Sequence, residues 1–264
     1  MYYGLINSMN RAVVASYTAR TTAFATATGI TDATILGALN TFDLGLISNS
    51  LDTKMKALYP FVGSTASTQK YNFMDARDLD VAFRLSFSGG GTFSSNGYQP
   101  NGTNAFADTF LSPSTSLVLN STHISAYIRT DLTSDAPVMS SEDGIYNKGL
   151  YIWPKSVASI YSVRINDDTS QTGSVSVVNG LHIATRTASN VKKYRVNNTQ
   201  MFNVTTASSS LNTDSIYIAK SRNHANYFRN EISFVSSGNG LTDGESTTFY
   251  NLVQAMQTTL GRQV

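Results

Sequence analysis

Residues 226–264 read NYFRNEISFVSSGNGLTDGESTTFYNLVQAMQTTLGRQV, and this C-terminal stretch carries the clearest structural pattern in the chain. Its first part alternates along the sequence, which predicts a strand over residues 227–235. One face of that strand would carry Phe228, Ile232 and Phe234, and the other Tyr227, Arg229, Glu231, Ser233 and Val235. Serine, glycine and asparagine fill residues 236–240 and predict a turn that ends the strand.

A helix is predicted after that turn. Thr242 and Glu245 have the spacing of a capping box, in which each side chain accepts the backbone N–H of the other residue. The closing helix is predicted over 243–260, with Gly261 as its stop and one apolar stripe made of Phe249, Leu252, Val253, Met256 and Leu260. The strand needs neighbours on both edges and the helix needs an apolar surface. The stretch is therefore expected to close a larger β domain.

Upstream of this stretch, short alternating runs are separated by turn residues such as Asn179-Gly180. Without intervening helices these strands must pair antiparallel, because parallel strands need long crossovers. We therefore predict a mainly β fold, an antiparallel β-sandwich with an N-terminal helical segment and a C-terminal helix. A closed barrel is the alternative. The predicted strands are 70–74, 81–87, 106–111, 123–130, 149–153, 159–166, 173–178, 180–187, 192–197, 201–205, 215–220 and 227–235.

The first 60 residues lack the alternating strand pattern of the rest of the chain. Residues 1–30 are weakly patterned, and the Ala/Thr-rich part over 13–28 suits either a helix or an extended arm. Two helical runs follow, one from Thr31 to Phe42 and one over 44–58 that ends before Pro60, because the residue before proline avoids the α region. The predicted organisation is an N-terminal arm over 1–30, a helical collar or anchor over 31–60, and a sandwich over 61–264.

Composition narrows the functional classes. The formal net charge of +2 is too small to favour a nucleic-acid partner or an anionic membrane surface. The chain has no cysteine, which excludes disulfides and thiolate metal sites. It also has neither an apolar run long enough to span a membrane nor a signal-peptide pattern at its N-terminus. We expect no nucleic acid and no membrane insertion.

One hairpin resembles a known fold family. The run KKYRVNNTQMFNV over residues 192–204 is similar to the Y-x-N-G-x-x hairpin of concanavalin A-like, or laminin-G-like, jelly rolls. It differs at Asn198, where that pattern prefers glycine, but asparagine also tolerates a positive φ. The resemblance implies that the sandwich is a jelly roll of this kind.

Two further motifs resemble a family of tailed-phage virion proteins from crAss-like and related phages of Bacteroidetes. They are KMKALYPFVG over 54–63 and the closing pair GLTD over 240–243 and QTTLGRQV over 257–264. This resemblance implies a virion structural protein, such as a head fibre, capsid decoration or tail fibre. It implies other virion proteins as partners, a homo-oligomer, assembly in the host cytoplasm, and attachment to a host surface glycan.

Catalytic motifs are not apparent. A glycosidase on this fold needs two close carboxylates, commonly two residues apart on one strand face. The three glutamates are Glu142, Glu231 and Glu245, and none has an acidic residue two positions away. Glu231 is predicted to pair with Arg229 on the same strand face. We therefore expect no catalytic residues, although a carboxylate pair from different strands stays open.

Metal and cofactor sites are not predicted either. His123, His182 and His224 lack zinc-ligand spacing. Acidic residues gather in one predicted loop at Asp131, Asp135, Glu142 and Asp143, and at Asp167-Asp168, but without a calcium-loop pattern. Hydrogen-bonded turn residues are the preferred interpretation, and calcium at the sandwich rim stays open.

Three aromatic residues are candidates for glycan binding, because an exposed ring can stack on a sugar face. Tyr151 and Trp153 lie two apart on one predicted strand, although core filling is the preferred interpretation for both. Tyr98 lies in the glycine-rich stretch over 89–102 and is expected to be exposed.

These observations give three functional hypotheses. The first is a non-enzymatic virion component that displays a jelly roll. The second is a carbohydrate-binding adhesin or receptor-binding protein, and the third is a polysaccharide depolymerase.

Overall fold

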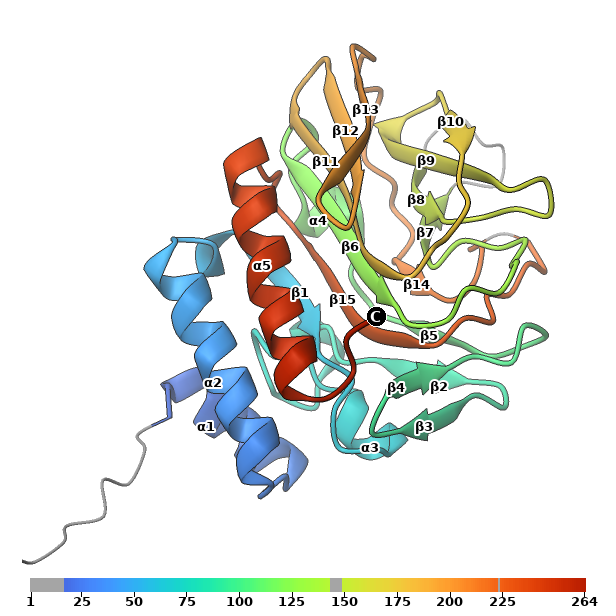
Figure 1. The fold of residues 1–264 in the computed structure, drawn as a ribbon. Helices are drawn as coiled ribbons and strands as arrows, with labels where there is room; N and C mark the ends of the chain where they lie inside the picture. Colours follow the sequence, from blue (N-terminus) through green and yellow to red (C-terminus); the bar gives the residue numbers. More distant parts are fainter. Residues whose placement is uncertain (1–16, 143–148, 223) are drawn as a thin grey trace, which may run out of the picture.

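The computed structural model describes residues 17–142, 149–222 and 224–264. Two antiparallel sheets pack face to face, and three helices cover the outer side of the first sheet (Figure 1). This arrangement confirms the predicted sandwich with N-terminal helices and a C-terminal helix. Among the described residues no helix is both long and apolar enough to cross a bilayer.

The first sheet has eight strands in the order β13-β12-β11-β6-β15-β4-β3, and β1 also pairs with β15. Every pairing within it is antiparallel. Its strands are β1 (Met55–Tyr59), β3 (Thr92–Ser94), β4 (Gly97–Gln99), β6 (Thr122–Ile128), β11 (Gly180–Ala188), β12 (Val191–Val196), β13 (Thr199–Val204) and β15 (Ile232–Gly238).

The second sheet has seven strands in the order β10-β9-β8-β7-β14-β5-β2, again antiparallel throughout. Its strands are β2 (Ser86–Ser88), β5 (Phe106–Asp108), β7 (Met139–Glu142), β8 (Gly149–Trp153), β9 (Ile160–Asp167), β10 (Gln171–Ser174) and β14 (Tyr217–Ile218).

The three covering helices are α1 (Ala19–Thr28), α2 (Ala33–Ser48) and α5 (Asp243–Thr259). Two short helices, α3 (Ala66–Gln69) and α4 (Pro113–Ser116), and two 3-10 turns, η1 (Asp52–Lys54) and η2 (Asp80–Ala82), lie in the connections. Because α5 packs on α2 and on the first sheet, the middle of that sheet is buried on both faces. Strand β6 is accordingly buried at every position.

Two hydrophobic cores result from this layering. One lies between the sheets and includes Ile124, Ile152 and Val163. The other lies between the first sheet and the helices, where Phe234 meets Phe42 and Phe249 at ring-centroid distances of 5.9 Å each. The helices therefore belong to the folded body and stabilise it by apolar burial.

Strand β15 is central in the first sheet, as its need for two neighbours predicted. A β-bulge between Ile232 and Phe234 changes the alternation, so that Ile232 and Val235 both face the core between the sheets while Phe234 faces the helices. The predicted break after residue 235 is wrong, since the strand continues to Gly238. A Cβ on Gly238 would lie 2.0 Å from the carbonyl oxygen of Lys54, so glycine is required by close strand approach.

The predicted start of the closing helix is confirmed. Thr242 Oγ1 accepts the backbone N–H of Glu245 at 3.4 Å, and the Glu245 carboxylate accepts the N–H of Thr242 at 2.8 Å. Lys54 adds an ion pair to Glu245 at 2.6 Å. The helix stops beside Gly261, whose φ is +66°.

The N-terminal part differs from the prediction at one segment and decides an open alternative at another. The proposed second helix over 44–58 is wrong: α2 ends at Ser48, and residues 55–59 form β1 in the first sheet. Pairing with β15 satisfies the backbone of this segment and overrides its helical spacing. The Ala/Thr-rich stretch contains the helix α1 and not an extended arm, because Phe24 is buried against Phe73. Residues 1–16 lie outside the described residues.

Other strand predictions had mixed outcomes. Strand 149–153 and the hairpin over 192–204 are confirmed, and Asn197 and Asn198 form the turn with φ values of +47° and +63°. Residues 70–74 form no strand, and residues 81–87 contribute only the start of β2. Val81 is 74% exposed, because it lies in the 3-10 turn η2 and not in a strand, although the sequence alternates there.

Candidate functional site

The second sheet has one face against the first sheet and one outer face. The three large helices lie on the opposite side of the molecule from this outer face (Figure 1). Register places a row of side chains across it, since Tyr151 pairs with Ser140, Ser140 with Tyr217, and Tyr217 with Asp108. The residues beside them on each strand, Ile152, Met139, Ile218 and Ala107, all belong to the core. The row therefore marks the outer face.

Three aromatic side chains gather at the β5–β14 end of this face, and we call them the aromatic patch: Phe106, Tyr217 and Tyr227. The ring centroids of Phe106 and Tyr217 are 5.0 Å apart, and those of Phe106 and Tyr227 are 6.4 Å apart. Each ring is half-buried. Tyr227 reaches the patch because it forms a β-bridge with Lys220, just beyond the end of β14.

Two cations lie against the aromatic patch. Lys220 Nζ is 4.7 Å from the ring centroid of Phe106, 5.5 Å from that of Tyr217 and 5.4 Å from that of Tyr227. The guanidinium carbon of Arg222 lies 4.2 Å from the ring centroid of Tyr217. Cation–π contacts of this kind stabilise the positions of the rings.

A polar hollow of about 340 Å³, which we call the rim cleft, adjoins the patch at Tyr227. Asn226 Nδ2 donates to the backbone carbonyl of Asp135 at 2.9 Å and so joins two walls of the cleft. Exposed Asp135 and Arg229 supply side chains of opposite charge. The lining consists of Gly102, Thr133, Ser134, Asp135, Val157, Ala225, Asn226, Tyr227 and Arg229.

Arg229 lies beside Gly102 and has no acidic partner among the described residues. Gly102, with φ of +73°, lies so close that a Cβ there would be 3.0 Å from the Arg229 Cβ. The predicted Arg229–Glu231 pair is wrong, because Glu231 forms an ion pair with Arg129 at 2.6 Å. The backbone N–H of Arg129 also donates to the carbonyl of Glu231 at 2.8 Å. In the described part of the chain, no carboxylate lies within ion-pair distance of Arg229.

The rim cleft combines an aromatic ring, an amide, a carboxylate and a guanidinium. A tyrosine face can stack on the apolar face of a sugar ring, while the polar groups hydrogen-bond its hydroxyls. Among the lining residues Asp135 is the single carboxylate, whereas glycoside hydrolysis usually needs two. The arrangement suits binding of a polyhydroxylated ligand better than hydrolysis.

The sequence-predicted residue Tyr98 is not part of this site. It lies in β4, is 1% exposed and packs against Phe61, Phe87 and Phe93. Burial raises the pKa of its hydroxyl well above the ordinary range. The expectation that Tyr98 is exposed is wrong, because the glycine-rich stretch folds into the β3–β4 hairpin and buries this ring in the core.

Tyr151 and Trp153 lie on the outer face of the second sheet and not in the core between the sheets. The predicted burial is confirmed for Tyr151 and only in part for Trp153. Tyr151 is only 7% exposed, because its hydroxyl bonds to Ser170 at 2.6 Å and the Arg164 guanidinium lies over its ring. Trp153 is half-buried on the same strand. The structure places this pair three strands away from β5 in the second sheet, separate from the aromatic patch.

The acidic residues predicted to share one loop are dispersed. Asp131 pairs with Lys155 at 3.1 Å, and Glu142 lies in β7. Asp167 is fully buried between Arg186 and Lys192, at 2.6 Å and 2.8 Å. Asp143 lies outside the described residues. Across residues 17–142, 149–222 and 224–264, no group of three or more potential ligands could hold a metal ion.

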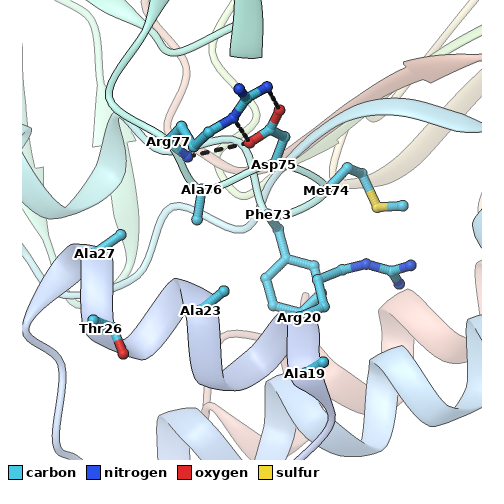
Figure 2. Close-up of a pocket in the computed structure, with 10 residues that line it drawn as sticks. All are labelled: Ala19, Arg20, Ala23, Thr26, Ala27, Phe73, Met74, Asp75, Ala76 and Arg77. Atoms are coloured by element: carbon cyan, nitrogen blue, oxygen red, sulfur yellow. Dashed lines mark hydrogen bonds and ion pairs between the residues drawn. The ribbon is translucent and has the colours of Figure 1, made fainter.

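A larger groove of about 570 Å³ lies between α1 and residues 73–77. Figure 2 shows the methyl groups of Ala19, Ala23 and Ala27 facing that loop, with Arg77 paired to Asp75 at its edge. Those two charges satisfy each other and the remaining walls are mostly apolar. The groove therefore offers few groups that could orient a polar ligand, and the rim cleft is the better candidate for carbohydrate.

No protein-family model and no curated protein matches this sequence. The fold is nevertheless shared with solved β-sandwich domains of the lectin-like class. One is domain 4 of AbnA, a GH43 extracellular arabinanase from Geobacillus stearothermophilus, in complex with arabinotriose. It is 12% identical, with a TM-score of 0.52, and the match covers 76% of this chain and 98% of that domain.

Two further matches are parts of longer proteins. Trypanosoma rangeli sialidase in complex with sialic acid is 10% identical, with a TM-score of 0.53, covering 75% of this chain and 33% of the sialidase. A structure of botulinum neurotoxin type C, whose cell entry depends on two ganglioside molecules, is 12% identical, with a TM-score of 0.50, covering 78% and 53%. At these identities the likeness establishes the fold.

Sequence reasoning missed all three residues of the aromatic patch. Phe106 and Tyr217 were inside predicted strands, and each stands next to a small or aliphatic core residue. That alternation between a core residue and an aromatic residue indicated that the aromatic ring points away from the core. Tyr227 carried the same signal, since it precedes the core residue Phe228, but its place beside Phe106 depends on the bridge to Lys220.

Proposed function

We propose that the chain is a non-enzymatic carbohydrate-binding protein and that the rim cleft holds the sugar, with Tyr227 as its stacking platform. The observation that carries this proposal is that an aromatic ring, Tyr227, lines a polar hollow formed by loops next to the aromatic patch. Aromatic rings of this type bind the apolar face of a sugar, and the surrounding donors and acceptors determine its orientation.

The fold likeness supports the same function. Two of the similar structures were solved with a sugar bound, arabinotriose in one and sialic acid in the other. A third concerns interaction with gangliosides. These are properties of those proteins, and they make carbohydrate the first ligand class to test here.

The test is a glycan array with the full chain, followed by titration of the best ligand. Tyr227→Ala removes the proposed platform and is expected to weaken binding at least tenfold, while Tyr227→Phe keeps the ring and most of the affinity. Tyr250→Ala, on α5 at the other side of the molecule, is the matched control. Binding that is unaffected by Tyr227→Ala, or no binding to any glycan, contradicts the proposal.

A virion role is a second candidate, based on the sequence resemblance and favoured by a separate surface. Leu44 and Ile47 on α2 are 52% and 47% exposed, and the apolar groove of Figure 2 also belongs to the helical side. Exposed apolar side chains suit contact with another protein, either a virion partner or a second copy of the chain. Attachment would then use the helices and leave the rim cleft free.

This second proposal has its own test. The double substitution Leu44→Ser with Ile47→Ser should reduce incorporation into phage particles and lower any oligomer seen by light scattering. Thr22→Ser, at an exposed position of α1, is the control. Wild-type levels of the double variant on purified particles would count against it. Truncations should stop at residue 16, because Phe24 is part of the core.

A further inference from the structure

We infer that the rim cleft selects a sugar bearing a carboxylate, with Arg229 as the residue that recognises it. This inference rests on the proposed function and specifies its ligand class.

The first argument is the free charge of Arg229. Glu231, two residues along, is taken by Arg129, and no other carboxylate of the described residues pairs with Arg229. Most other acidic and basic side chains at the edges of the molecule do pair, for example Lys193 and Arg195 with Asp243. An exposed guanidinium without a partner, at the edge of a hollow, is available to a ligand.

The second argument is the shape of the donor group. A guanidinium presents parallel N–H donors that match the two oxygens of a carboxylate, and such bidentate contacts are stronger than neutral hydrogen bonds. Gly102 lies against the stem of Arg229, because a Cβ at residue 102 would be 3.0 Å from the Arg229 Cβ. The absence of a side chain at residue 102 therefore leaves room for the Arg229 stem in the lining of the cleft.

The third argument is the charge distribution around the cleft. Lys220 Nζ is 5.4 Å from the ring centroid of Tyr227, and Lys220 makes no ion pair with a described carboxylate. Arg222 lies against Tyr217 but is paired with Asp214 at 3.5 Å, so its charge is compensated. Lys220 therefore makes the Tyr227 side of the cleft favourable for an anion. Asp135 lies in the same lining and can accept hydrogen bonds from sugar hydroxyls. The expected pose places the carboxylate at Arg229, the ring on Tyr227 and the hydroxyls at Asp135.

The experiment compares matched ligands. Uronic-acid and sialic-acid oligosaccharides are titrated against the full chain beside the same oligosaccharides with each carboxyl reduced to an alcohol. The native protein is expected to bind the carboxylate form at least about tenfold more tightly, as charged hydrogen bonds allow. That preference should weaken as salt is raised, because an exposed ion pair is screened.

Variants assign the preference to one residue. Arg229→Gln should bring the affinity ratio of the two ligand forms close to one, and Arg229→Lys should retain part of it. Arg84→Gln, which removes an exposed guanidinium paired with Asp80 elsewhere, should leave the ratio unchanged. Thermal unfolding of each variant establishes that it folds.

The outcomes separate the two proposals. Tight binding of reduced, neutral glycans with no preference for the carboxylate overturns this inference and leaves carbohydrate binding intact. A preference that survives Arg229→Gln, or one shared equally with sulfated sugars and inorganic sulfate, also overturns it. Failure of every pair to bind also overturns this inference, and the proposed function is contradicted in addition only if no glycan of the array binds.

Discussion

Acid should destabilise this protein between pH 7 and pH 5, through two buried histidines. His123 and His182 are both fully buried, and burial lowers the pKa of each imidazole to about 4. Their hydrogen bonds fit the neutral ring: His123 Nδ1–H donates to the carbonyl of Asn239 at 2.6 Å, and His182 Nε2–H donates to that of Val178 at 2.7 Å. Protonation would place an unpaired charge in the core.

The direction and the size of this pH effect on stability follow from proton linkage. Each folded pKa lies below the unfolded value of about 6.5, so the unfolded chain binds more protons and stability falls as the pH is lowered. Between pH 7 and pH 5 each histidine should cost about 2 kcal/mol, or about 4 kcal/mol for both. A typical domain has only about 5–15 kcal/mol of stability, so this loss is large. Carboxylates with lowered pKa, such as Asp243 and Glu245, act at lower pH.

The assay is urea unfolding followed by circular dichroism at several pH values from 5 to 8. His182→Gln can still accept from the Tyr194 hydroxyl and donate to Val178, but it cannot titrate. It should remove about half of the slope, and His123→Gln should remove about the other half. The reasoning is refuted if native stability changes by less than about 1 kcal/mol over this range, or if the double variant keeps the native slope.

Two further predictions concern packing and buried charge. Gly238→Ala should destabilise the fold by at least about 2 kcal/mol in a urea titration, because the new Cβ would meet the Lys54 carbonyl oxygen at 2.0 Å. The control is Gly244→Ala, which has open space around it and should be neutral or stabilising in the same titration. Asp167→Asn should cost about 3–5 kcal/mol, because it leaves the buried Arg186 and Lys192 without their shared carboxylate. A change below about 1 kcal/mol at Gly238 or Asp167 would contradict the contact in question.

The class of fold was accessible from local pattern. Alternation over 149–153, the Asn197-Asn198 turn and the Thr242–Glu245 capping box depend on neighbouring residues and on backbone geometry, and the structure confirms each. These features are local, so their physical causes are contained in a few consecutive residues.

Errors arose where a distant partner overrode the local pattern. Residues 55–59 have helical spacing but pair with β15, almost two hundred residues away, and the bulge after Ile232 changes which side chains of that strand face each core. Tyr98 follows a flexible-looking glycine-rich stretch, yet the core fills around its ring. Strand pairing, bulges and ring burial of this kind depend on which distant segments pack together. Local residue spacing does not determine that packing.

The candidate site shows the same division. The amino-acid sequence was enough to indicate a sandwich and its closing helix, because alternation and short-range spacing control those features. The site itself depends on the tertiary fold: Phe106, Tyr217 and Tyr227 come from three separate segments, and Glu231 pairs with Arg129 from another strand and not with Arg229 two residues away. Packing of the two sheets brings these distant segments together. The local sequence pattern does not show which of them will become neighbours.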